Sequence, residues 1–261
     1  MKRNRNFIVA VTQCASLAGQ VGSNLRKVTE LCAEARKRHA DLLLFPECHA
    51  TGYSYRALPA LVEKTAEPMD GPIGRHLRMA ARDFSMVICC GMFERDDGAF
   101  YNTLLVAFPD GRLERQRKGS PSPAEIGLLN FDPIRLAFRW KDTTFGILVC
   151  ADNRIPDFRE QFEKLGIELL LHPSAGSIAE PGPQGAANLK AESEAALNCG
   201  RALARDLRLS YAVANPIGFS GEDYYPGNSW VIDPLGAVLV HLPPTSIVAE
   251  MKDSVGAAAL A

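Results

Sequence analysis

Residues 146–157 read GILVCADNRIPD, an apolar run that ends at a cysteine and passes at once into a polar turn. The run TFGILVC (residues 144–150) predicts a buried strand, and the pattern from about 155 to 165 predicts a helix behind it. A strand followed by a helix and another strand is a unit of a parallel sheet. Cys150 therefore stands at the carboxyl end of a strand, where α/β sheets gather their functional sites.

The same alternation extends toward the C-terminus. LAFRW (136–140) predicts a hairpin partner, and ELLLHPS (168–174) predicts the next strand. Residues 175–187 are rich in Gly and Pro and predict an irregular surface loop. A helix over about 188–207 follows, then YAVANPIG, a turn at 221–226, and the strands SWVIDP and GAVLVHL.

The N-terminal half has a similar plan. FIVAVTQCA (7–15) and DLLLFPE (41–47) predict strands, with a helix between them that begins behind a Ser/Asn cap near residue 23. A second helix is predicted over 71–84, with Pro72 in its first turn, and three antiparallel strands follow between 86 and 119. Strands that alternate with helices and hairpins predict an α/β fold, a layered sandwich of mixed sheets covered by helices.

Composition excludes several classes of protein. The 261 residues are 47% apolar and carry 29 Lys and Arg against 30 Asp and Glu, so charge gives no reason to expect nucleic acid or a membrane as partner. No apolar run is long enough to span a bilayer, and the MKRNRN start is unlike a secretion signal, so we expect a cytoplasmic protein. The seven cysteines show no zinc-type CxxC pairs and favour reduced thiols.

Four reactive residues stand at predicted strand ends: Glu47, Lys118, Cys150 and His172. Singly, each has an ordinary structural explanation as a solvated loop residue or an apolar filler. Together they supply a base, a cation and a nucleophile at equivalent positions of separate strands. A helix beginning near Arg154 would place the Cys150 thiol at its positive end, where thiolate is favoured.

Five motifs carry a resemblance over nearly the whole chain: LLLFPECHATGY, RQRKGSPSPAE, LVCADNRIPD, LLLHPSA and GNSWVIDPLGAVL. In order and spacing they resemble the motifs of the nitrilase, or carbon–nitrogen hydrolase, superfamily. The resemblance implies one domain over residues 1–261, a four-layer α-β-β-α sandwich with two mixed sheets, and a homo-oligomer, a dimer or larger. It also implies a catalytic triad of Glu47, Lys118 and Cys150 that needs no metal or organic cofactor.

The resemblance further implies a chemical mechanism. Cys150 would attack the carbonyl of a small-molecule amide, Glu47 would carry protons, and Lys118 with the backbone N–H of Ala151 would stabilise the oxyanion. Glu125 matches a further glutamate that would orient Lys118 or substrate, the alternative being a solvated loop carboxylate. CADNRIPD resembles the amidase pattern more than the nitrilase one, which favours a linear amide or N-carbamoyl substrate.

Departures from the family motifs, and other polar residues near the predicted site, leave alternative interpretations open. Lys118-Gly119-Ser120-Pro121 replaces the common Lys-Thr-His-Leu, which leaves the substrate class open and motivates a catalytically silent binding or assembly module as the alternative. His172 is a rival base for Cys150, although no orienting Asn or Asp accompanies it at a recognisable spacing. Tyr53 is either a pocket residue or simple packing, and Cys48 and His49 are expected in the pocket wall. Asp152 and Arg154 are expected as an Asx cap and an ion pair that fix the turn after Cys150.

Overall fold

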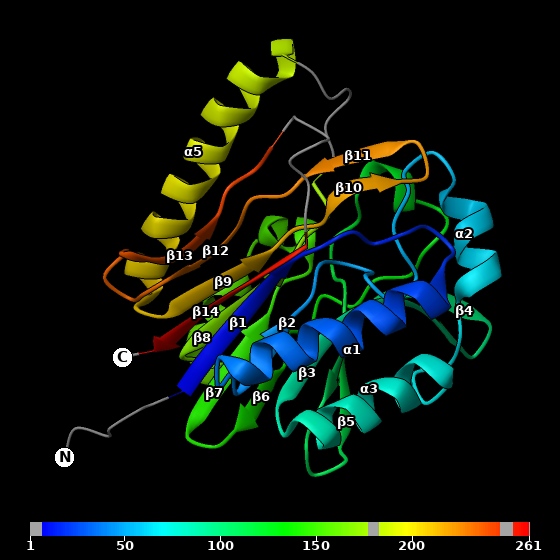
Figure 1. The fold of residues 1–261 in the computed structure, drawn as a ribbon, viewed down its shortest axis with the longest axis horizontal. Helices are drawn as coiled ribbons and strands as arrows, with labels where there is room; N and C mark the ends of the chain where they lie inside the picture. The colour runs from blue at the N-terminus through cyan, green and yellow to red at the C-terminus, as the bar shows by residue number, and fades with distance from the viewer. Residues whose placement is uncertain (1–6, 177–182, 246–252, 261) are drawn as a thin grey trace.

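The computed structural model describes residues 7–176, 183–245 and 253–260 (Figure 1). One six-stranded sheet, which we call sheet A, runs in the order β14-β1-β2-β3-β4-β5. The β1, β2 and β3 strands are parallel, and the other pairs are antiparallel. The strands of sheet A are β1 (Phe7–Gln13), β2 (Leu42–Leu44), β3 (Val87–Asp96), β4 (Ala99–Ala107), β5 (Leu113–Arg117) and β14 (Ser254–Leu260).

The second six-stranded sheet, sheet B, runs in the order β13-β12-β9-β8-β7-β6. Here β7, β8 and β9 are parallel, and β6, β12 and β13 join by antiparallel pairing. Both sheets are therefore mixed, as predicted. The strands of sheet B are β6 (Ala137–Trp140), β7 (Thr143–Ile147), β8 (Leu169–Pro173), β9 (Ser210–Ala214), β12 (Ser229–Ile232) and β13 (Val238–Leu242).

The two sheets pack face to face through apolar side chains that alternate along the strands. Val9 and Val11 of β1 point into the cluster between the sheets, whereas Ala10 points into the cluster under the helices. Because both faces of β1 are covered, its sequence is apolar at almost every position. The inter-sheet cluster also includes Ile147 and Leu171 from sheet B.

Helices cover both outer faces (Figure 1). The α1 (Val21–Lys37) and α3 (Pro72–Phe84) helices pack on sheet A, and α4 (Phe158–Leu165) and α5 (Pro183–Leu207) pack on sheet B. The result is the predicted four-layer α-β-β-α sandwich. A short helix, α2 (Leu58–Thr65), follows the segment after β2 and was not predicted.

Several local predictions were wrong. The α1 helix begins at Val21 behind Gln20 without a side-chain cap, because Asn24 instead bonds the backbone of Leu17 and Ala50. Residues 221–226, predicted as a turn, include the second strand of a hairpin. Its strands are β10 (Ile217–Ser220) and β11 (Asp223–Pro226).

The loop predicted over 175–187 is also shorter than expected. The α5 helix begins at Pro183, since proline is tolerated in a first helical turn. Residues 177–182 of that loop lie outside the described residues. Within the C-terminal tail, whose conformation was not predicted, Ser254–Leu260 form β14 and pair with β1. Among the described helices, none combines the length and apolarity needed to cross a bilayer.

Candidate active site

Glu47, Lys118 and Cys150 lie just beyond the ends of β2, β5 and β7, respectively. A close backbone approach helps to position Glu47. A Cβ atom at Gly91 of β3 would lie 2.4 Å from the backbone nitrogen of Cys48, so only glycine lets β3 pass this close to the turn that carries Glu47.

Lys118 joins two buried carboxylates. Its Nζ donates to Glu47 Oε1 at 2.7 Å and to Glu125 Oε1 at 3.0 Å, and all three side chains are at most 1% exposed. Asn102 of β4 donates from Nδ2 to the same two oxygens, at 2.8 and 3.0 Å. Asn102 was not predicted, although an amide within the apolar run of β4 is itself a signal.

The second oxygen of Glu47 is a buried atom without a hydrogen-bond partner among the described residues. A buried carboxylate oxygen normally accepts at least one hydrogen bond, and leaving it unpaired is costly. Burial raises the pKa of Glu47, and the nearby charge of Glu125 raises it further, against the opposing effect of Lys118. Glu47 Oε2 is thus suited to accept a proton.

The two other members of the network are charged. Burial works against the ammonium form of Lys118, but the charges of Glu47, Cys150 and Glu125 outweigh it and hold the pKa of Lys118 well above its usual range. Burial likewise opposes ionisation of Glu125, yet Lys118 and two further hydrogen-bond donors, the Ser122 N–H and Asn102 Nδ2, lower the pKa of Glu125. A cation is therefore held between the two carboxylates.

Cys150 occupies a strained backbone position, with φ at 47°, in the left-handed region. It begins a 3₁₀ helix (Cys150–Arg154), and its Sγ accepts a hydrogen bond from Ser174 Oγ at 3.6 Å. Ser174 was not predicted. Burial, with the charge of Glu47, raises the pKa of the Cys150 thiol to about 11, whereas Lys118 lowers it.

The expected activation of Cys150 by a helix end was therefore wrong. The α4 helix begins only at Phe158, and desolvation outweighs the favourable charges around the sulfur. At neutral pH the thiol is protonated and needs a base to become a nucleophile.

Asp152 ties the Lys118 loop to the turn at Cys150. One of its oxygens accepts from the backbone N–H groups of Gly119 and Ser120, at 2.8 and 2.9 Å. The other accepts from Val149 N–H at 2.9 Å and pairs with the Arg135 guanidinium at 2.6 Å. Asp152 thus caps the turn rather than α4, and the arginine of its ion pair is Arg135, not the predicted Arg154.

His172 of β8 supports the same turn. Its Nε2 lies 2.8 Å from the carbonyl oxygen of Cys150, and its Nδ1 contacts the hydroxyl of Tyr211. A carbonyl only accepts, so Nε2 carries the proton and Nδ1 accepts from Tyr211. Because burial lowers the pKa of His172 to about 4 and both nitrogens are engaged away from Sγ, the geometry does not favour the rival imidazole base.

The remaining predicted residues surround this network. Tyr53 is buried behind the Glu125 turn, where its hydroxyl lies 3.0 Å from Ser122 Oγ, and this is packing rather than a pocket wall. Ala151 is buried directly after Cys150. Cys48 donates to Asn102, and His49 is buried against Ser16. In the described parts of the chain, no cluster of three or more His, Cys, Asp or Glu is arranged as metal ligands.

Comparisons with known proteins identify the family of this chain. The sequence model described as "Carbon-nitrogen hydrolase" matches residues 8–259. An (R)-stereoselective amidase from a Pseudomonas species is 26% identical over 233 residues, which cover 88% of this chain and 79% of that protein. The mouse omega-amidase NIT2 is 28% identical over 228 residues, covering 83% and 77%.

Solved structures share the fold. A cysteine-to-alanine mutant of an amidase from Nesterenkonia AN1, of the nitrilase superfamily, superposes with a TM-score of 0.80 at 22% identity, covering 99% of this chain and 92% of that one. Another mutant of that amidase carries the acetamide moiety of fluoroacetamide on its active-site cysteine, with a TM-score of 0.78, 22% identity and coverage of 99% and 91%.

Proposed function

Because this chain belongs to the carbon–nitrogen hydrolase family, we propose that it hydrolyses a small linear amide or N-carbamoyl compound through a thioester on Cys150. Its amidase relatives support cysteine-dependent amide hydrolysis in general. The substrate type and the role of each residue are our proposal. The roles rest on the geometry around Glu47, and the substrate type rests on the amidase-like sequence that follows Cys150.

Glu47 is the proton carrier in the first half of the reaction. Its free Oε2 takes the proton of the Cys150 thiol, and Sγ forms a bond to the substrate carbonyl carbon. Lys118 and the Ala151 N–H stabilise the negative oxygen that develops. The carbon–nitrogen bond then breaks, Glu47 returns its proton to the leaving nitrogen, and ammonia or an amine departs.

Water completes the reaction. Glu47 takes a proton from water, the resulting oxygen nucleophile attacks the thioester carbon, and the carbon–sulfur bond breaks. The sulfur regains its proton from Glu47, and the acid product leaves. The sum is one amide plus one water giving one carboxylic acid plus ammonia or an amine, without any redox change.

The observation that carries this proposal is the buried, unpaired Oε2 of Glu47 in a site whose thiol has a pKa of about 11. A thiol of that pKa is almost wholly protonated at neutral pH, so a base must remove its proton during attack. A glutamate whose pKa is raised toward neutrality is the more effective base. Lys118, held between Glu47 and Glu125, supplies the positive charge that the oxyanion needs.

A silent binding module is the second candidate, because the sequence after Lys118 departs from the common pattern. The structure gives a local reason for that departure. A Cβ atom at Gly119 would lie 2.5 Å from the Arg135 guanidinium and 2.7 Å from the carbonyl oxygen of Asp132, so glycine is required beside the Asp152–Arg135 pair. The altered loop remains compatible with catalysis.

Alkylation of Cys150 tests the reactivity that the proposal requires, because Sγ can displace fluoride from fluoroacetamide and keep the acetamide moiety. The protein is incubated with fluoroacetamide and its intact mass is measured, with Cys199→Ala as background to remove the exposed thiol. We expect one adduct, absent from Cys150→Ala and formed far more slowly by Glu47→Gln. Ammonia release from a panel of amides and carbamoyl amines is measured in parallel. An unreactive Cys150 together with no ammonia release would instead support the silent module.

A further inference from the structure

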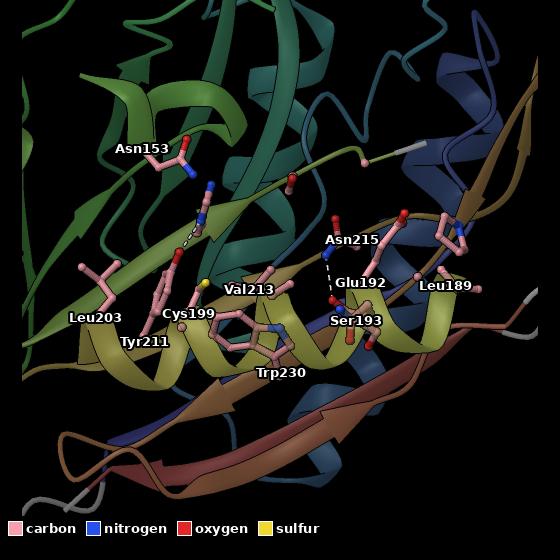
Figure 2. A pocket seen from close by; sticks show the side chains of 18 residues that line it. Asn153, Leu189, Glu192, Ser193, Cys199, Leu203, Tyr211, Val213, Asn215 and Trp230 are labelled. Atoms are coloured by element: carbon pink, nitrogen blue, oxygen red, sulfur yellow. Dashed lines mark hydrogen bonds between the residues drawn. The ribbon is translucent and has the colours of Figure 1, made fainter. Parts of the chain in front are cut away.

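We propose that the cavity beneath α5 receives the acyl arm of the substrate, and that this arm is apolar and uncharged. The inference rests on the proposed function and names its substrate class. The cavity has a volume of about 400 Å³ and lies between α5 and strands of sheet B (Figure 2). This size is within the range of small-molecule sites in proteins.

The inner walls of the cavity are mainly apolar. Tyr211 of β9 and Trp230 of β12 form one wall, with ring planes at 86° and centroids 4.9 Å apart. Leu203 of α5 lies at the same end of the cavity as Tyr211, and Leu189 lies toward the other end of α5 (Figure 2). Aromatic and aliphatic walls favour a hydrocarbon chain or ring, because burying apolar surface is the main source of affinity in such a pocket.

One end of the cavity adjoins Cys150. Ser174, which lines the cavity, donates its hydroxyl to Cys150 Sγ at 3.6 Å. His172, which also lines it, holds the carbonyl of Cys150 at 2.8 Å. An acyl group attached to Sγ has its carbonyl carbon at this end, so a chain of a few carbons can extend from Cys150 past Ser174 into the cavity.

Charge in the cavity selects against a carboxylate. Glu192 contributes a negative group, and none of the described lining residues is a lysine or arginine. Two α5 cations are nearby in sequence, but Arg201 Nε donates to the carbonyl oxygen of Gly236 at 2.9 Å, and the exposed Lys190 is not a lining residue. A second carboxylate beside Glu192, with no cation among the described lining residues, is repelled, so the monoamide of a dicarboxylic acid fits this cavity poorly.

Chain length and terminal charge are tested with matched primary amides. Ammonia release is measured for propanamide, hexanamide and the monoamide of adipic acid, which is hexanamide with one terminal carboxylate. We expect kcat/KM to rise on the order of tenfold or more from propanamide to hexanamide, and to fall by a similar factor for the adipic monoamide.

Two variants address the cavity itself. Ala196→Phe, which places a ring in the cavity, should reduce the ratio of hexanamide to propanamide kcat/KM about tenfold. Ala195→Phe, at an exposed α5 position that does not line the cavity, is the control and should leave both values unchanged. Glu192→Lys should raise kcat/KM for the adipic monoamide, because it replaces repulsion with attraction.

The outcomes separate the two proposals. If propanamide is hydrolysed but chain length has no effect, or the adipic monoamide is preferred, the cavity assignment is wrong while the amidase proposal stands. If kcat/KM for N-hexylacetamide exceeds that for propanamide by as much as the value for hexanamide does, the arm in the cavity is the amine and the acyl assignment is overturned. If no amide is hydrolysed and Cys150 forms no adduct with fluoroacetamide, both proposals fail.

Discussion

Replacing Glu125 with Gln should move the acid limb of the pH–activity profile to lower pH. Glu125 contributes a negative charge beside Glu47, and that charge raises the pKa of Glu47. Glutamine keeps the shape of the side chain and an oxygen for Asn102 and Lys118, and it loses the hydrogen bond that Glu125 Oε2 accepts from the Ser122 N–H at 2.7 Å. The substitution therefore removes the charge with little change in packing, and Glu47 should lose its proton more readily.

The size of the shift follows from the geometry around Lys118. Its Nζ lies 2.7 Å from the Glu47 oxygen and 3.0 Å from the Glu125 oxygen, so these two oxygens lie within about 6 Å of each other. Two unit charges at about 6 Å interact by roughly 3 kcal/mol at an effective dielectric constant near 20, or about 2 pKa units. Relaxation of the site reduces this, and we expect a downward shift of about 1 to 2 pH units.

The assay is kcat/KM for propanamide from pH 4 to pH 9, followed by ammonia release, because the acid limb of kcat/KM reports the base of the free enzyme. The pH dependence of Cys150 alkylation by iodoacetamide is a second measurement. Glu114→Gln, which removes a half-buried carboxylate of β5 that pairs with Arg112, is the matched control and should leave the profile in place. An acid limb that stays fixed or moves upward in Glu125→Gln would refute the electrostatic account of this network.

Three further changes test other parts of the site. Asp152→Asn leaves Arg135 buried without its counter-ion and should reduce the free energy of unfolding, measured by urea titration, by about 3 to 5 kcal/mol. A loss below about 1 kcal/mol would show that the Asp152–Arg135 ion pair does not stabilise the turn as described. His172→Ala should slow both turnover and Cys150 alkylation. His172→Gln still offers a donor to the Cys150 carbonyl oxygen and should recover part of both rates. Equal loss of rate in the two variants would argue against a role for this hydrogen bond. His49 is buried with a pKa of about 4, against about 6.5 in the unfolded chain, so its neutral form contributes stability above pH 6.5 that is lost as pH falls toward 4. His49→Gln should therefore flatten the dependence of the melting temperature on pH over that window, whereas substitution of the exposed His39 with Asn should not.

The sequence by itself determined the layers of the fold and supplied the candidates for the catalytic residues. Unbroken apolar strands such as FIVAV, separated by helical patterns, can be buried only between two layers, which requires a sandwich. Glu47, Lys118 and Cys150 were recognisable because strand ends and motifs are local properties of the chain. The cap of α1 was mispredicted because Asn24 bonds the distant backbone of Ala50. The hairpin at 217–226 was mispredicted although its two short strands pair locally, because its second strand was predicted as a turn.

Only the tertiary structure decided how these residues act on one another. Asn102 and Glu47 are 55 positions apart in the sequence, and the fold brings them into hydrogen-bond contact. This bond uses one carboxylate oxygen of Glu47 and leaves the other free. Burial, rather than a helix end, sets the pKa of Cys150, and Arg135, rather than Arg154, pairs with Asp152. Local sequence patterns report which face of a strand or helix is buried, whereas the charge, desolvation and partners of a side chain depend on which remote segments pack against it.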